Sequence, residues 1–440
     1  MVTRTPRPSS LRRHHAPLPK GRVGDHRVTT APGPWSPPLF ERPGLRPAGV
    51  RDIWRDIGPH YVSNGVVGLA FSASGPVAVT LTVGSLGGLT EAQLASWVFA
   101  MFLSAGAATL VMSLIYRQPL GFAWSIPGTV LLGPSLQHLS FPEVVGAFFS
   151  AGVLILALGC SGVVRPIMAA IPVPIVMAMV AAVFLRFGTD IVSSTQADPA
   201  VAAPMVVAFL VLTAVPSLGK RLPPVLGTLA TGVVAVVVSG RFTILAGGPI
   251  LAAPVFTAPA FTWAAQLELV IPLALTVLVV QNGQGAAVLR AAGHNPPINV
   301  FAMSSGLFSL LNALLGAVSA CVTGPTNALL TASGQKRRQY TAAVVYGLLS
   351  LACALLAPTL TSLMLATPEA FVLTLGGIAM LRALQQAFVT AFATNFTLGA
   401  LVTFVVTISG LDLFNIHAAF WGVLIGYGIS RLLERQDHKP

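Results

Sequence analysis

The chain of 440 residues is 54% hydrophobic and only 9% charged, with a mean hydropathy of +0.80. Soluble domains carry about 25% charged residues, so this composition excludes an ordinary soluble fold and indicates a polytopic membrane protein. The net charge of +12 reflects a basic tail and basic loops, which orient a membrane protein. It gives no reason to expect nucleic acid as a partner.

The N-terminal residues 1–55 are rich in Pro and Arg and short of aliphatic side chains. Such a segment buries too little apolar surface to fold alone, so we expect a disordered, basic cytoplasmic tail. Residues 434–440 form a second, short polar tail at the C-terminus. Three cysteines lie within apolar segments, which favours neither a disulfide framework nor a metal site: Cys160, Cys321 and Cys353.

Apolar runs recur along the rest of the chain, most of them close to the ~17–25 residues that a spanning helix needs. They cover residues 61–86, 92–116, 143–163, 170–185, 200–216, 224–240, 266–282, 297–315, 340–365, 368–381, 395–410 and 417–433. Two shorter, broken stretches raise the expected total to about 14 crossings. Arg382 and two glutamines interrupt residues 368–394, so the second part of that run is alternatively an interfacial amphipathic helix.

The charged residues support this topology because basic residues collect in short cytoplasmic loops of membrane proteins. With the N-terminus inside, the inner loops and the inner C-terminus hold Arg117, Arg165, Lys220, Arg221, Arg290, Lys336, Arg337, Arg338, Arg382, Arg431, Arg435 and Lys439. The outer loops hold Glu91, Glu143, Asp190, Asp198, Glu268, Glu369 and Asp412, and only two basic residues, Arg186 and Arg241. We therefore expect both termini in the cytoplasm and one crossing for each broken stretch.

Two similar broken stretches stand at matching places in the two halves of the chain. Residues 125–132 read Ser-Ile-Pro-Gly-Thr-Val-Leu-Leu, and residues 323–330 read Thr-Gly-Pro-Thr-Asn-Ala-Leu-Leu. Gly- and Pro-interrupted segments at corresponding positions are typical of the binding site of a duplicated transporter. The sequence thus predicts one repeat over residues 56–245 and a second over residues 260–433.

The chemistry of these stretches follows from the backbone that they expose. A half-helix that begins inside the membrane leaves its first N–H groups unpaired, which is tolerated where they line a cavity. Pro127 and Pro325 suit the first helical position, and Gly128 and Gly324 allow a ligand to approach the backbone. Two positive helix ends at the midplane favour an anion or a polar group. The alternative is that Pro and Gly only kink packed helices.

A second polar group of residues, Gln281-Asn282-Gly283-Gln284-Gly285, closes the first span of the second half. Side-chain amides donate and accept hydrogen bonds, so Gln281 and Asn282 are suited to a carboxylate without adding charge. Contact between helices, with a Gly-rich helix end, is the alternative. The predicted substrate-binding set is Ser125, Pro127, Gly128, Thr129, Gln281, Asn282, Thr323, Gly324, Pro325, Thr326 and Asn327.

The chain from about Asp52 to Arg431 resembles the benzoate/proton symporter (BenE-type) family of bacterial inner membranes. The matching stretches are residues 123–128, 171–172 through 185–188, 281–282 with 285–293, and 407–410 with 419–422. The resemblance implies a fold of seven plus seven segments in two inverted repeats, which is shared with nucleobase carriers. In that fold each broken segment pairs a short strand with a half-helix. Carriers of this fold often form dimers, so a homodimer is also implied.

The function that we expect is secondary active import of benzoate or a related aromatic carboxylate with a proton, without a cofactor and with the lipid bilayer as surroundings. A nucleobase or another small organic anion on the same fold is the alternative. A channel and a membrane enzyme are weaker alternatives, since the sequence holds no catalytic motif and no nucleotide-binding loop. Candidates for the proton-carrying residue are His60, His138, His417 and Glu268, each near the end of a span.

Overall fold

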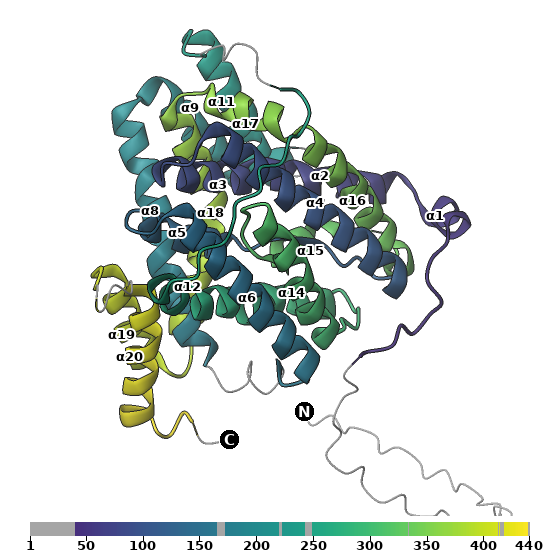
Figure 1. Ribbon diagram of the computed structural model, residues 1–440. Helices are drawn as coiled ribbons and strands as arrows, with labels where there is room; N and C mark the ends of the chain where they lie inside the picture. Colours follow the sequence, from purple (N-terminus) through teal and green to yellow (C-terminus); the bar gives the residue numbers. More distant parts are fainter. Residues whose placement is uncertain are drawn as a thin grey trace, which may run out of the picture. The chain divides into compact units, whose positions relative to one another are not determined.

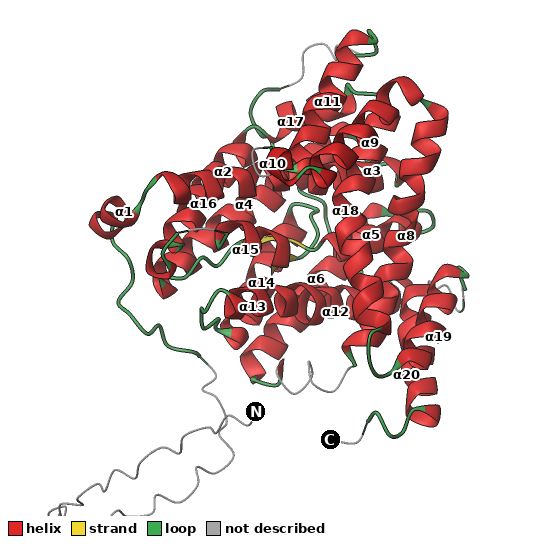
Figure 2. Ribbon diagram, turned by 180° about the vertical axis from the view of Figure 1, so that it is seen from behind, coloured by secondary structure: helices red, strands yellow, loops and turns green. Residues whose placement is uncertain are grey.

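The computed structural model describes residues 40–164, 172–219, 222–242, 249–332, 334–411, 413 and 418–438. Several residues named above lie outside this part of the chain: the first 39 residues of the predicted tail, Arg165, Ile171, Lys220, Arg221, Asp412, His417 and Lys439. The described residues belong to one unit of the chain, residues 38–440, and they are mostly helical (Figures 1 and 2).

The first half runs from a short helix, α1, to α11. Its elements are α1 (Val50–Asp56), α2 (Pro59–Ala73), α3 (Gly75–Leu86), α4 (Glu91–Tyr116), β1 (Phe122–Trp124), α5 (Ile126–Ser135), α6 (Phe141–Ser161), α8 (Val173–Ala197), α9 (Pro199–Ala214), α10 (Pro216–Gly219) and α11 (Pro224–Val238). Local sequence explains several starts. Thr90 and Gln93 form a capping box at α4, and many of the other helices have Pro in the first turn, where no N–H is lost.

The second half follows the same sequence of elements. It holds α12 (Trp263–Leu275), the π-helix η1 (Thr276–Gln281), α13 (Asn282–Ala291), α14 (Ile298–Leu314), β2 (Ala320–Val322), α15 (Gly324–Leu330), the 3-10 helix η2 (Lys336–Arg338), α16 (Tyr340–Leu355), α17 (Ala357–Leu365), α18 (Glu369–Phe392), α19 (Thr397–Ile408) and α20 (Ala418–Leu433). The interrupted run at residues 368–394 forms one continuous helix, α18, with Arg382 exposed.

Six helices of the described part are long and apolar enough to cross a membrane: Pro59–Leu86, Glu91–Tyr116, Phe141–Ser161, Val173–Ala197, Trp263–Ala291 and Glu369–Phe392. A seventh span results if Lys336–Leu355 and Ala357–Leu365, which meet at 71°, are counted as one. Five further apolar helices have 10–17 residues. The predicted total of about 14 crossings exceeds these counts and stays a prediction.

Helix packing in the first half recurs in the second. α6 of the first half packs on α14 and α12 of the second, and α16 of the second half packs on α4 and α2 of the first. α8 and α18 pack closely against each other, and the pairs α9 with α11 and α19 with α20 are equivalent in the two halves. This repeated arrangement is the one that a duplicated chain produces, although the predicted bounds of the two repeats are not tested by it.

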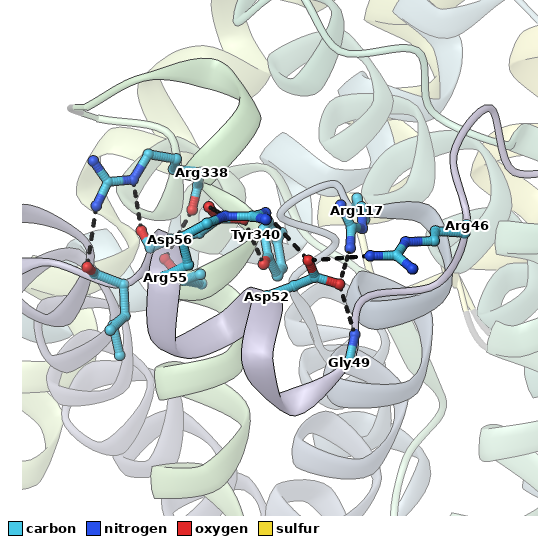
Figure 3. A network of polar contacts seen from close by, with 10 residues as sticks. Arg46, Gly49, Asp52, Arg55, Asp56, Arg117, Arg338 and Tyr340 are labelled. Atoms are coloured by element: carbon cyan, nitrogen blue, oxygen red, sulfur yellow. Dashed lines mark hydrogen bonds and ion pairs between the residues drawn. The ribbon is translucent and has the colours of Figure 1, made fainter.

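The last residues of the predicted tail form a helix next to the first span, and the predicted domain bounds stay a prediction. Helix α1 spans Val50–Asp56, and its Asp52 forms an ion pair with Arg117, the C-cap residue that follows α4 (Figure 3). The Gly49 N–H donates to Asp52 at 3.1 Å. This hydrogen bond, together with the nearby guanidinium of Arg117, lowers the pKa of the Asp52 carboxyl. Charge pairing thus fixes a segment whose own apolar surface is small.

A second group of contacts joins the same segment to the other half of the chain. Arg338 donates to the carbonyl oxygens of Asp56 and Ile57 at 2.7 and 3.1 Å, and the Tyr340 hydroxyl donates to Asp56 at 2.9 Å (Figure 3). Upstream, the Glu41 carboxylate accepts from the first N–H groups of α14, at Asn299 and Val300, at 3.0 and 3.1 Å. Residues 41–57 therefore connect the ends of α4, α14 and α16.

Candidate substrate site

The two broken stretches meet in a two-stranded antiparallel sheet. β1 pairs with β2 in the register Phe122 with Val322, Ala123 with Cys321 and Trp124 with Ala320, and Figure 2 shows the strands beside α15. Each strand is followed by one residue and then by a short helix, α5 or α15. Because the strands are antiparallel, the two helices leave the sheet in opposite directions, and their N-termini lie at opposite ends of the sheet.

The N-terminus of α5 is closed by its own cap residue. The Ser125 hydroxyl accepts from the Gly128 N–H at 3.1 Å and donates to the Thr276 hydroxyl of η1 at 3.1 Å. The Thr129 hydroxyl donates to the Ser125 carbonyl at 3.0 Å. All of these side chains are buried, and Pro127 occupies the first turn. The sequence therefore folds here as a serine-capped helix that is tied to the second half of the chain.

The N-terminus of α15 differs from that of α5. Thr323 is its cap residue, yet the Thr323 hydroxyl makes no hydrogen bond within the described part of the chain. Pro325 lies in the first turn, and Gly324 permits close contact with Gln284 of α13: a Cβ added at Gly324 would lie 3.3 Å from the Gln284 Oε1 atom. A buried hydroxyl without a partner is costly, so an unpaired Thr323 is noteworthy at a candidate site.

Two of the predicted binding residues are used by the backbone of the sheet. Asn282 accepts from the Val322 N–H of β2 at 2.8 Å and exchanges hydrogen bonds with Ser305 of α14. Asn327 bonds to the backbone of Gly121, just before β1. Both amides are buried. The structure assigns them a positioning role, and direct contact with a substrate stays a prediction for each.

Gln281 occupies a different environment from Asn282. It is the last residue of the π-helix η1, a rare element that is often found at functional sites. Its side chain is buried and makes no hydrogen bond to any other described residue. Gln281 and Gln284 both line the cavity beside the sheet. Sequence analysis singled out Gln281 and Asn282 alike, and the hydrogen bonds now distinguish the two.

A narrow cavity of about 60 Å³ lies between the broken segments and the helix pair α8 and α18. Uncharged polar residues on its wall come from several elements: Ser72, Gln281, Gln284, Thr323 and Thr326. The apolar wall is formed by Phe71, Pro76, Ala123, Trp124, Ile126, Pro127, Met177, Val180, Phe184, Val280, Pro325 and Met380. No Asp, Glu, Lys, Arg or His is among these described lining residues.

The lining relates only in part to the residues that sequence analysis selected. Gln281, Pro127, Thr323, Pro325 and Thr326 line the cavity, whereas Ser125, Gly128, Thr129, Asn282, Gly324 and Asn327 build the surrounding backbone. Sequence reasoning missed the apolar wall, including Phe71, Trp124 and Phe184. These residues carry no motif, since an aromatic residue in a membrane span is ordinary. Gln284 had a signal, because it belongs to the same amide-rich stretch as Gln281.

A larger cavity, of about 680 Å³, lies along α5, α8 and α12. Its wall includes Glu268 of α12 and Ser135, the last residue of α5. The Glu268 carboxylate is 4% exposed and bonds to the hydroxyl of Ser135 and, at 2.9 Å, to the Nε2 atom of His138. Glu268 and His138 were separate candidates for the proton-carrying residue, and the structure brings them together.

The fold defined by these two crossed strand and half-helix segments is that of a membrane transporter. Solved structures with the same fold include that of SLC26A9, with a TM-score of 0.60 and 13% identity over 88% of this chain and 66% of that chain. The transmembrane domain of the cyanobacterial bicarbonate transporter BicA gives a TM-score of 0.57 and 14% identity over 87% of this chain and 98% of that chain.

The protein belongs to the BenE family of benzoate membrane transport proteins, whose pattern matches residues 55–432. It is 31% identical to the inner membrane protein YdcO of Escherichia coli, over 82% of this chain and 91% of that protein. It is 27% identical to a benzoate membrane transport protein of Acinetobacter baylyi, over 82% of this chain and 92% of that protein. It is a membrane transport protein and not an enzyme, as the family resemblance predicted.

Proposed function

We propose that this protein imports benzoate or a related aromatic carboxylate, together with a proton, across the bacterial inner membrane. Its membership of the benzoate transport family supports the substrate class. The name of its Escherichia coli relative supports the inner membrane as its location. Both termini lie in the cytoplasm in this proposal, in keeping with the distribution of basic residues. The proton gradient supplies the energy, and no cofactor takes part.

The observation that carries the proposal is the lining of the narrow cavity. Aromatic and sulfur-containing side chains, among them Phe71, Phe184 and Met380, suit the face of an aromatic ring. Thr323 supplies a buried hydroxyl without a partner in the described part of the chain, and Gln281 supplies an amide on the cavity wall; both groups suit a carboxylate. An apolar pocket with a few convergent polar groups is the general form of a small-molecule site.

The absence of charge from the described cavity lining supports the cotransport of a proton. A carboxylic acid with a pKa of ~4 is an anion at pH 7. A charge at the membrane centre costs ~2.5–3.5 kcal/mol on insertion scales. A helix N-terminus stabilises a nearby anion by up to ~2 kcal/mol in a partly buried geometry. Polar donors therefore hold the anion, and a proton that moves in the same cycle cancels the net charge.

The site must widen during transport in this proposal. Its volume of about 60 Å³ is below the ~300–1,000 Å³ that is usual for ligand sites. Met177 and Phe184 of α8 and Met380 of α18 form one wall, whereas the broken segments form the other. Movement of the broken segments against α8 and α18 opens the cavity to one side at a time. Fourteen crossings in two inverted repeats, and a homodimer, belong to the same proposal.

A nucleobase is the second candidate substrate, and one observation favours it. Gln281 and Gln284 both line the cavity with side-chain amides, which can match the donors and acceptors on the edge of a planar base. A nucleobase is neutral, so it needs no charge compensation in the cavity.

Counterflow in proteoliposomes separates the two candidates. Purified protein is reconstituted with unlabelled benzoate inside, and the entry of radiolabelled benzoate is followed without a proton gradient. Competition is then measured with cyclohexanecarboxylate, acetate and uracil. We expect benzoate counterflow that cyclohexanecarboxylate reduces and that uracil leaves unchanged. Counterflow of uracil, with none of benzoate, would contradict the proposal and support the nucleobase carrier.

A further inference from the structure

We infer that Glu268 and His138 together form the site that binds the transported proton, at the mouth of the larger cavity. The inference rests on the proposed symport and names the residues that carry it out. Its basis is a buried carboxylate in direct contact with a histidine, on elements that are linked to the substrate site.

The carboxylate has a defined set of partners. One oxygen of Glu268 accepts from the Ser135 hydroxyl, and the other lies 2.9 Å from the His138 Nε2 atom. The Glu268 side chain is 3% exposed and that of His138 is 28% exposed. A buried carboxylate in a membrane protein is costly and usually marks a functional group. The more exposed histidine gives this carboxylate a route for protons from water.

Glu268 lines the larger cavity, and His138 bonds to it beside that lining. The cavity wall includes exposed residues, Gln137, Arg186 and Thr189, so the cavity opens to the protein surface. Gln137 and Arg186 lie on the side that the charge distribution predicts to face outward. Protons that enter under an inward gradient therefore meet the pair before they meet the narrow cavity.

The charged and titratable groups around Glu268 come from several elements. His138 follows α5, Arg186 and Asp190 of α8 lie on the cavity wall, and Glu143 lies in the first turn of α6, which packs on α12. The lining of the larger cavity holds Arg186 and Asp190 with opposite charges.

Two hydrogen-bonded contacts connect the pair to the substrate site. α5 extends from its cap residue Ser125 to Ser135, and the stretch from Glu268 of α12 to Thr276 of η1 runs beside it. Ser135 bonds to Glu268 at one end, and Ser125 bonds to Thr276 at the other. The two bridges are about 12 Å apart along α12, at 1.5 Å per residue. Protonation of Glu268 therefore acts on one end of the unit formed by α5, α12 and η1. The other end of this unit includes Ser125, which caps α5, and Gln281, the last residue of η1.

The charge balance of the cycle is simple. One proton from outside binds the Glu268 and His138 pair, and one carboxylate binds the narrow cavity, so the loaded protein gains no net charge. Both leave on the inner side, and the empty, deprotonated protein returns. Each turn moves one proton and one carboxylate inward, with no bond made or broken in the substrate.

The test compares two kinds of transport in proteoliposomes. Substrate exchange at equal pH needs no net proton movement, whereas accumulation driven by an inside-alkaline gradient does. A gradient of one pH unit sustains up to about tenfold accumulation at a ratio of one proton to one substrate. Glu268→Gln keeps the shape and the hydrogen-bonding capacity of the side chain but cannot release a proton. The matched control is Glu369→Gln, because Glu369 is an exposed glutamate on the same predicted side.

We expect Glu268→Gln to retain exchange within about twofold, to lose gradient-driven accumulation, and to lose the pH dependence of uptake. Glu369→Gln should behave as the wild type. Accumulation by Glu268→Gln equal to that of the wild type would overturn the inference. So would loss of exchange by folded protein, since a proton site is not needed for exchange. If Glu268→Gln does not fold, His138→Gln and Glu268→Asp are measured in the same way, with weaker accumulation and a shifted pH profile expected.

The outcomes for the wild type keep this inference separate from the proposed function. Wild-type exchange without gradient-driven accumulation would contradict symport itself and leave the substrate assignment standing. Neither exchange nor accumulation of benzoate by inserted wild-type protein would contradict the substrate assignment.

Discussion

The side-chain amide of Asn327 pairs with the backbone of Gly121 in the way that the backbone of a neighbouring strand would. Its Nδ2 atom donates to the Gly121 carbonyl at 2.8 Å, and its Oδ1 atom accepts from the Gly121 N–H at 2.9 Å. The same Nδ2 atom donates to the Thr323 carbonyl at 2.6 Å. One amide from the second half of the chain therefore bonds to both backbone groups of a buried glycine in the first half, in addition to their backbone contacts with Pro119 and Thr323. This pairing extends the two-stranded sheet by one residue and sets the distance between the broken segments.

Replacement of Asn327 by Ala should destabilise the protein and reduce uptake together. The substitution removes one hydrogen bond from the N–H of Gly121 and one from its carbonyl, which keep only backbone contacts to Pro119 at 3.1 Å and to Thr323 at 3.4 Å. Two lost hydrogen bonds in a buried environment cost roughly 1–3 kcal/mol. Thermal unfolding in detergent and radiolabelled uptake measure the two effects. The control is Asn295→Ala, which changes an exposed asparagine. Full stability of Asn327→Ala would show that this pairing does not support the site.

Replacement of Gln281 by Glu should affect substrate affinity more than replacement by Ala. Loss of one amide hydrogen bond costs ~0.5–1.5 kcal/mol, which is a few-fold in KM. A carboxylate at position 281 faces the substrate carboxylate, and close like charges cost several kcal/mol, which is more than tenfold in KM. Uptake kinetics at pH 7 and pH 5.5 check this order, and the Glu variant should recover at the lower pH. An equal KM for wild type and both variants would remove Gln281 from the site.

Replacement of Gly285 by Ala should disturb β2. A Cβ at Gly285 would lie 2.7 Å from the Val322 Cγ1 atom and 2.9 Å from the Val322 carbonyl oxygen. Such overpacking costs ~1–3 kcal/mol. Gly133→Ala is a matched control on α5, since nothing lies within 4 Å of its added Cβ, and we expect a gain of ~0.5–1 kcal/mol there. Melting temperatures that shift in the same direction for both variants would contradict this packing argument.

A fall in pH should weaken the hydrogen bond between His294, in the loop between α13 and α14, and Gln339, which precedes α16. Burial lowers the pKa of His294 from its usual value of 6.5, and the positive charge of Lys336 lowers it further. The hydrogen bond to Gln339, at 2.8 Å, raises the pKa but does not offset these two effects. The unfolded chain then binds a proton more readily than the folded protein. His294 therefore contributes stability that is fully present above pH 6.5 and is lost as the pH falls through the folded pKa.

The difference in melting temperature between pH 7.5 and pH 5.5 measures this effect. It should be smaller for His294→Asn than for the wild type, because the variant has no group that titrates at this position. His60→Asn, which changes an exposed histidine, should match the wild type. A pH dependence that His294→Asn leaves intact would assign it to other groups.

Much of the fold was accessible from the sequence, because membrane spans and Pro-Gly interruptions leave strong local patterns. Residues 125–132 and 323–330 were predicted to form matching broken segments, and both do so as α5 and α15 with their preceding strands. The sequence left open whether residues 368–394 form one continuous helix, since Arg382 interrupts their apolar pattern. The charge pairs of Asp52 and Asp56 explain why helix α1 forms inside the predicted tail. Such partners are distant in the sequence.

The candidate site could be predicted only in part. Local sequence points to residues that break a helix, and it therefore selected Asn282 and Asn327 along with Gln281. Whether an amide bonds to the backbone or faces a cavity depends on tertiary contacts, as with Val322 and Gly121. The pairing of Glu268 with His138 joins positions 130 residues apart, and no spacing rule relates them.

Gradient-driven uptake of benzoate tests the central claim most directly. Wild-type protein in proteoliposomes is given radiolabelled benzoate with an inside-alkaline pH gradient, with no gradient, and with the gradient collapsed by an uncoupler. The account predicts accumulation above the external concentration only with the intact gradient. Uptake that merely equilibrates under all three conditions, in liposomes with confirmed insertion, would contradict proton-coupled import.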